Sequence, residues 1–117
     1  MTRRTQRING LIRDEISLLL QRQVKDPRLG GLVTVTGVST SADLRHAKIF
    51  VSIMGDETEK KEALAGLDRA SGFFRRELAE RISLRRIPDL SFHRDDSIEQ
   101  GTHLLKLIER LSSSDTD

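Results

Sequence analysis

Arginine side chains crowd around a short break that contains a glycine, Ala70-Ser71-Gly72, in the second half of the sequence. Seven arginines but only three acidic residues lie between residues 69 and 94, and arginine outnumbers lysine fifteen to five in the chain. The planar guanidinium group can bind a phosphate through two parallel hydrogen bonds and can stack on a nucleobase. The glycine and the free N–H groups of a following helix would let a phosphate approach. This stretch therefore favours polyanion binding, although an ordinary joint between two helices also explains Gly72.

Residue types that perform catalysis or hold metals are present, but their spacing favours neither role. The three histidines, His46, His93 and His103, stand at no metal-ligand spacing to one another, and cysteine is absent. Asp95 and Asp96 are adjacent at a predicted helix start, where carboxylates cap backbone N–H groups rather than converge on one substrate atom. No glycine motif that cradles a nucleotide occurs in the chain. We therefore expect no enzymatic activity, no metal and no cofactor.

Charge is arranged in blocks along the chain, although the net charge is only +2. Residues 1–28 and 69–94 are net positive, whereas residues 55–68 and 95–117 are net negative. Such blocks can present a basic face to a polyanion while the total charge stays low. Tyr and Trp are absent and there are only four Phe, so few aromatic side chains are available to stack on nucleobases at a sheet surface. The lack of cysteine, of a signal-like N-terminus and of a long apolar run favours a cytoplasmic protein without membrane contact.

The elements that must position the arginines follow from hydrophobic periodicity, which predicts the order α-β-β-α-α-β-α. Helices that cover one face of a three-stranded sheet would make this an α+β domain. We expect one domain at residues 1–111 and a frayed C-terminal tail at 112–117. The predicted elements are a helix at 5–24, strands at 32–40 and 45–54, helices at 56–70 and 73–87, a strand at 89–94 and a helix from 97.

Polar residues at the predicted boundaries indicate where three of the helices begin. Thr5 is a plausible cap for the first helix, and the pair of Asp56 and Glu59 has the spacing of a capping box. Ser97 and Gln100 have the same spacing at the start of the last helix. We therefore expect the side chains of Thr5, Asp56 and Ser97 to accept hydrogen bonds from backbone N–H groups.

Alternating apolar residues predict that the first two strands form an antiparallel hairpin. In the first strand Gly37 interrupts the alternation, and a β-bulge there would restore the register. In the second strand one face is apolar throughout and is expected to point into the core; its residues are Ala47, Ile49, Val51 and Ile53.

An acidic residue one helical turn away gives an arginine a structural role. Glu77–Arg81 and Arg76–Glu80 have that spacing and are interpreted as structural pairs. Arg85 and Arg86 fall at the predicted end of a helix, where a favourable interaction with the helix dipole explains them equally well. The arginines without a local acid are Arg3, Arg4, Arg7, Arg13, Arg69 and Arg75.

The order of elements resembles a type II KH-like domain with an additional C-terminal helix. Ala70-Ser71-Gly72 stands where KH domains carry a G-x-x-G loop, and no G-x-x-G occurs in this chain. An A-x-G joint at that place resembles the bacterial ribosome-binding factor A family. Other segments that resemble the family are the pattern RI-N-LI-R-EI-LL at 7–20, KDPR at 25–28, VTVTGV at 33–38, DLRHAK followed by IFVS at 43–52, and LRRIPDL with Phe92 at 84–92.

This resemblance implies a cytoplasmic factor that binds the immature small (30S) ribosomal subunit and its 16S rRNA. The factor would assist late maturation of the rRNA, including processing of its 5′ end, would leave before translation and would have no enzymatic activity. Other ribosome assembly factors are further expected partners, and we expect a monomer. The residues predicted to bind RNA are Arg3, Arg4, Arg7, Arg13, Arg45, Lys48, Arg69, Ser71, Gly72, Arg75, Arg76, Arg85 and Arg86.

Two other functions stay open at this point. A KH-type regulator would bind short single strands of RNA, although the missing G-x-x-G and the scarce aromatic residues weigh against it. A protein–protein adaptor would use the acidic last helix, with Leu104 or Leu107 in the contact. Nanomolar, sequence-selective binding to a short oligonucleotide would favour the first function, and binding that survives high salt and needs Leu104 or Leu107 would favour the second.

Overall fold

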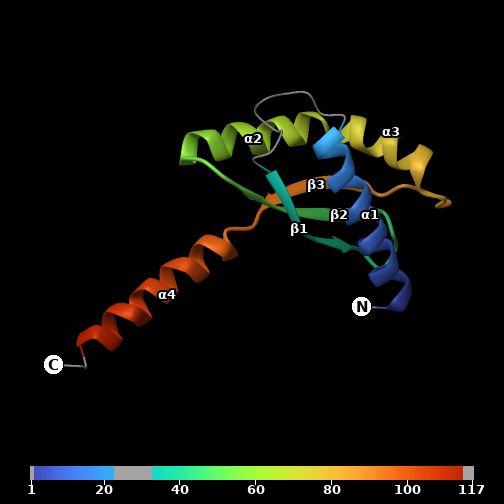
Figure 1. Ribbon diagram of the computed structural model, residues 1–117. Coiled ribbons are helices and arrows are strands. Elements are labelled where there is room, and N and C mark those ends of the chain that lie inside the picture. The colour runs from blue at the N-terminus through green and yellow to red at the C-terminus, as the bar shows by residue number, and fades with distance from the viewer. Residues whose placement is uncertain (1, 23–32, 115–117) are drawn as a thin grey trace.

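The computed structural model describes residues 2–22 and 33–114, and its elements follow the predicted order. The central strand β2 pairs antiparallel with β1 and in parallel with β3, so the sheet has the order β1-β2-β3. The α+β, KH-like arrangement agrees with the prediction and is shown in Figure 1. The elements are α1 (Arg3–Arg22), β1 (Val33–Thr40), β2 (His46–Ile53), α2 (Glu57–Arg69), α3 (Ser71–Arg81), β3 (Asp89–Arg94) and α4 (Ser97–Ser114).

The hydrophobic core lies between one face of the sheet and the helices α1, α2 and α3. The apolar face of β2 is buried as predicted, since each of its four side chains is at most 4% exposed. Burial of one such aliphatic side chain stabilises the fold by about 1.5–3 kcal/mol. The helices contribute the buried residues Ile8, Ile12, Ile16, Leu19, Leu20, Ala63, Leu67, Phe74 and Leu78.

The predicted bulge at Gly37 is confirmed, because the register of β1 against β2 shifts between Val35 and Gly37. The extra residue reverses the alternation, so Val38 returns to the face of Val33 and Val35. All three valines are half-buried and pack against the core.

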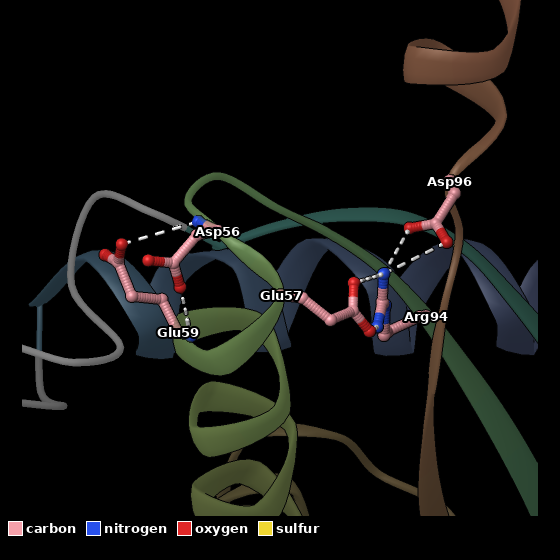
Figure 2. A network of polar contacts seen from close by, with 5 residues as sticks. All are labelled: Asp56, Glu57, Glu59, Arg94 and Asp96. Carbon is pink, nitrogen blue, oxygen red and sulfur yellow. Dashed lines mark hydrogen bonds and ion pairs between the residues drawn. The ribbon is translucent and has the colours of Figure 1, made fainter.

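The predicted helix starts are partly wrong. At α2 the capping box is confirmed: Asp56 Oδ1 accepts a hydrogen bond from the Glu59 N–H at 2.8 Å, and the Glu59 carboxylate accepts one from the Asp56 N–H (Figure 2). At α1 the cap is Thr2 rather than Thr5, because the Thr2 hydroxyl accepts a hydrogen bond from the Thr5 N–H at 3.2 Å. Thr5 is itself buried inside the helix.

At α4 the start at residue 97 agrees with the prediction but the predicted cap is wrong, and at α3 the helix begins earlier than the apolar spacing predicted. Ser97 is the first residue of α4 rather than its cap, and the Gln100 N–H donates to the Asp96 carbonyl at 2.9 Å. This bond places the N-cap at Asp96. At α3 the helix begins at Ser71 rather than Phe73, so that only Ala70 separates it from α2. The predicted helix end at 23–24, the KDPR segment at 25–28 and the predicted strand start at 32 lie outside the described residues.

The last helix α4 is the exception to the prediction that the helices cover one face of the sheet. It extends away from the sheet and the other helices (Figure 1). Its large apolar side chains from Leu104 onward are exposed; for example Leu104 is 57% and Leu105 is 62% exposed. None of the helices within the described residues has the length and hydropathy needed to cross a membrane.

Candidate nucleic-acid interface

Three hollows meet at the loop of residues 82–88, which joins α3 to β3, and Leu84 lines all of them. The first, of about 550 Å³, lies between the loop and α3, where Gly72, Arg75 and Arg76 contribute to its wall. The second, of about 160 Å³, and the third, of about 280 Å³, lie between the loop and the first turns of α1. The loop therefore brings two helices that are distant in sequence to one surface.

Apolar anchors explain why this loop turns its arginines outward. Ile82 ends α3 by taking an extended conformation, with φ −115° and ψ 127°. Ile87 and Pro88 are buried at the other end of the loop, and Leu84 packs half-buried against the core. Because the loop is pinned at both ends, its two arginines, Arg85 and Arg86, are left exposed.

The position of Arg85 and Arg86 corrects the predicted helix end. The structure ends α3 at Arg81, so these arginines lie in the loop and not in the last turn of a helix. The helix dipole acts within about one turn of the helix end, and it therefore does not account for them. A signal for the loop was present in the sequence, because the apolar spacing of Phe74, Leu78 and Ile82 is continued by arginines.

Arg75 was predicted to be without a partner, and this prediction is wrong. Its Nε and Nη2 donate to the Ile87 carbonyl at 3.3 Å each, and its Nη1 lies 3.5 Å from Asp89 Oδ1. Ile87 lies near the end of the loop and Asp89 directly follows it, so both partners are too far along the chain from Arg75 for a pairing rule within one helix to find them. Arg75 holds the end of the loop against α3 and lines the first hollow at the same time.

Two further arginines have partners that differ from those predicted. Arg13 was predicted to be free but lies 3.5 Å from Asp14 Oδ1, with both side chains more than half exposed. Such exposed pairs contribute about 0–1 kcal/mol, so Arg13 stays accessible. In contrast, Arg76 forms no ion pair with Glu80 or with any other described residue, although that pair was predicted. Arg81 binds Glu77 at 3.6 Å as predicted and also lies 3.8 Å from Glu15.

The arginines that line the hollows without an ion pair to a described residue form what we call the arginine surface. They come from α1, from α3 and from the loop, and all are exposed. They are Arg4, Arg7, Arg76, Arg85 and Arg86. The other predicted cations, Arg3, Arg45, Lys48 and Arg69, are also exposed and without such an ion pair, but they line none of these three hollows.

The joint between α2 and α3 lies at the edge of the first hollow. Ser71 is half-buried and Gly72 is exposed, and no side chain caps the start of α3. A Cβ built at Gly72 would meet only Arg76 Nη1, at an ordinary 3.8 Å, so the fold itself accepts a larger residue there. The helix joint alone therefore does not explain the glycine, and close approach by a ligand remains its predicted role.

Arg94 belongs to the sequence cluster at 69–94 but lies away from the three hollows, beside the start of α2. Figure 2 shows its guanidinium group between Glu57 at the start of α2 and Asp96 before α4. Arg94 Nη2 lies 3.1 Å from Glu57 Oε2 and 3.2 Å from Asp96 Oδ2. The hydrogen bond to Arg94 lowers the pKa of Glu57, and the pKa of Arg94 is raised in return. Arg94 therefore ties three elements together and offers little charge to a ligand.

Charge is consequently segregated along the length of the molecule. In Figure 1 the first turn of α2 and the whole of α4 lie at the left, while α3 and the loop after it lie at the right. Among the described residues, the left end carries the acidic start of α2, with Asp56, Glu57 and Glu59, and the right end carries the loop with Arg85 and Arg86. This arrangement suits a polyanion that approaches from the end where the loop lies.

Comparisons with known proteins agree on one family. A family model described as ribosome-binding factor A matches residues 4–108. A protein of Acetivibrio thermocellus with the same description is 46% identical over 110 residues, which are 94% of this chain and 89% of that protein.

Two solved structures are similar to this chain in fold and in sequence. The crystal structure of ribosome-binding factor A from Thermus thermophilus is 28% identical, with a TM-score of 0.68 over 77% of this chain and 94% of that one. A homology model of the Thermus thermophilus factor, fitted into a cryo-EM map of a complex with the 30S subunit, is 27% identical, with a TM-score of 0.61 over 83% of this chain and 97% of that one.

Proposed function

Since this chain belongs to the ribosome-binding factor A family, we propose that it binds the small ribosomal subunit through the arginine surface. The observation that carries the proposal is the convergence of five arginines from three separate segments around Leu84, with no acid paired to any of them among the described residues. The Thermus thermophilus relative was fitted into the map of a 30S complex, which supports the choice of partner.

The proposed binding mode is recognition of phosphates on folded 16S rRNA. Guanidinium groups around a hollow can contact several phosphates of a compact RNA segment, and such contacts position a protein without reading sequence. Gly72 and Ser71 would admit a phosphate beside the start of α3. Arg3, Arg45, Lys48 and Arg69 would extend the contact around the rim, and Arg13 would join it by leaving Asp14.

In this proposal the protein assists late maturation of 16S rRNA, including processing of the 5′ end, without an enzymatic step of its own. It would act in the cytoplasm as one domain of residues 1–111 and as a monomer. A protein that binds one rRNA conformer more tightly than another shifts the population toward that conformer by its difference in affinity alone. The factor would leave once maturation removes the favoured conformer.

The experiment is co-sedimentation of the protein with isolated 30S subunits. The double variant Arg85→Glu and Arg86→Glu should bind at least about ten-fold more weakly and should show a flatter dependence of affinity on salt, because fewer counterions are released. The control is Lys61→Glu with Lys106→Glu, which changes the net charge equally but lies on α2 and α4. Equal binding of the arginine variant and the wild type would overturn the proposal.

A further inference from the structure

The sheet face opposite the core carries no buried side chain among the described residues, so it is open to a partner. Its residues are those that alternate with the core residues along the three strands, and neighbouring strands present them side by side. Each is either exposed or half-buried. They are Thr34, Gly37, Ser39, His46, Lys48, Phe50, Ser52, Asp89, Ser91 and His93.

Two aromatic rings lie next to each other in the middle of this face. Phe50 and His93 are directly paired in the register of β2 and β3, and their ring centroids are 5.7 Å apart at an angle of 38°. Phe73, Phe74 and Phe92, the other phenylalanines, pack in or against the core. The fold therefore brings its one phenylalanine outside the core together with a histidine, which the count of aromatic residues could not show.

Polar contacts hold the histidine in position. His93 Nε2 lies 2.9 Å from the Ser91 hydroxyl, two residues earlier on the same face of β3. A ring that is fixed in this way loses little conformational freedom when a planar partner stacks on it. Stacking on aromatic side chains is how proteins bind unpaired nucleobases, because every base has a π-face.

Opposite charges flank the aromatic pair, so a nucleotide with a negative phosphate can bind this face in one orientation only. Lys48 is exposed two residues before Phe50 on the same face, about 7 Å along the strand. At the other end, Asp95 Oδ2 accepts a hydrogen bond from the Thr36 hydroxyl at 2.7 Å, and its Oδ1 accepts one from the Ser97 N–H at 2.9 Å. Hydrogen bonds from Ser97 and Thr36 lower the pKa of Asp95, so it stays ionised and repels a phosphate.

Asp89, the acidic residue within this face, does not oppose binding in the same way as Asp95. Asp89 starts β3, and its carboxylate lies 3.5 Å from the guanidinium of Arg75. The Asp89 N–H donates to the Arg45 carbonyl at 2.8 Å, which joins this end of the face to the turn before β2. Residues Asp43 and Leu44 of that turn line the second hollow together with Arg85 and Arg86. One end of the open face therefore lies beside the turn that borders the arginine surface.

We propose that the open sheet face binds an unpaired nucleobase of a single-stranded RNA segment, with Phe50 and His93 stacked on the base and Lys48 bound to its phosphate. The inference rests on the proposed function, since the segment would extend from RNA held at the arginine surface. The ionised Asp95 excludes the reverse orientation, with the phosphate at the far end. The chemical class of the ligand is a single-stranded ribonucleotide, not a duplex.

The direct test is NMR of the full chain with ¹³C-labelled phenylalanine rings, titrated with a single-stranded hexa-adenylate at low salt. Stacking should shift the ring signals of Phe50 upfield and should leave those of Phe73 in place, because Phe73 packs against the core. A fully paired RNA duplex of the same length is the control ligand and should not shift the Phe50 signals. No shift of Phe50 at saturating hexa-adenylate would overturn the inference.

Variants separate this inference from the proposed function. Phe50→Leu keeps an apolar side chain without a π-face and should bind hexa-adenylate about ten-fold more weakly, whereas Phe50→Tyr should bind like the wild type. Phe73→Leu is the matched control for loss of a half-buried ring, and thermal melting checks that all variants fold. Equal affinity of Phe50→Leu and the wild type would refute the stacking platform alone. Unchanged 30S binding by the Arg85→Glu, Arg86→Glu variant would refute the proposed function alone.

Discussion

At the scale of single residues, the partners of an arginine decide whether it can bind a ligand. Arg75 and Arg76 are neighbours on α3 and both line the first hollow, but only Arg75 has partners among the described residues, at Ile87 and Asp89. Arg75 therefore supports the loop, while Arg76 is available to a phosphate. Counting arginines in the sequence treats the two as equal, and their different surroundings separate them.

Replacing Arg75 with Met should lower the free energy of unfolding by about 1 kcal/mol, because hydrogen bonds from a charged group to the Ile87 carbonyl are lost at a half-exposed site. Urea denaturation measures this change. The matched variant Arg76→Met should leave stability unaltered, since Arg76 has no ion pair with a described residue. If both variants are equally stable, Arg75 does not hold the loop.

At the scale of elements, two helices with similar apolar periodicity have different surroundings. Five apolar residues of α1 are buried in the core, whereas the large apolar residues of α4 from Leu104 onward are exposed, including Ile108 at 49% and Leu111 at 66%. An apolar stripe predicts that a helix can pack but not that it does. Leu104 and Leu107 are therefore accessible to a partner protein, as the adaptor function requires.

Replacing Leu104 with Ala should change the free energy of unfolding by less than about 0.5 kcal/mol, because the side chain is already 57% exposed. The same replacement at Leu78, a fully buried core residue of α3, should cost about 2–5 kcal/mol. Chemical denaturation of both variants makes the comparison. A large loss at Leu104 would mean that α4 folds back onto the body of the protein.

At the scale of the whole molecule, the fold separates charges that alternate in blocks along the chain. The acidic start of α2 lies at one end of the molecule, and the loop after α3, which carries Arg85 and Arg86, lies at the other (Figure 1). At the acidic end Arg94 joins α2, β3 and the segment before α4 through Glu57 and Asp96 (Figure 2). The stability of the whole molecule should therefore respond to protonation at that end.

The pKa of Glu57 is lowered below 4.5 in the folded protein, chiefly by its hydrogen bond with Arg94. A carboxyl group with a lowered pKa contributes stability above its unfolded pKa and loses it as the pH falls through the folded value. We expect Glu57→Gln to be less stable than the wild type near pH 7 and the difference to shrink in acid. Urea denaturation across that pH range measures it. A constant difference would show that the Glu57 charge does not stabilise the fold.

Features that depend on neighbours along the chain could be predicted from the sequence alone. The alternation of β2, the bulge at Gly37 and the capping box of Asp56 and Glu59 were predicted correctly, because period-two burial and helix capping act within a few residues. The prediction that Thr5 caps α1 is wrong, because Thr2, three residues earlier, carries the same hydroxyl group and provides the cap. The predicted helix after Ala70 ended too late in the chain. The extended conformation of Ile82, which ends α3, depends on the burial of Ile87 and Pro88.

Contacts between side chains that are distant along the chain, in contrast, came only from the three-dimensional packing. Arg75 reaches Asp89, Arg94 reaches Glu57, and the ring of Phe50 lies beside that of His93, each through the packing of separate elements. The same packing brings the first turn of α1 and the loop of residues 82–88 around Leu84, which makes one surface from two basic blocks. Composition indicated how much positive charge the chain carries, but the spacing between charges depends on long-range contacts that local patterns do not encode.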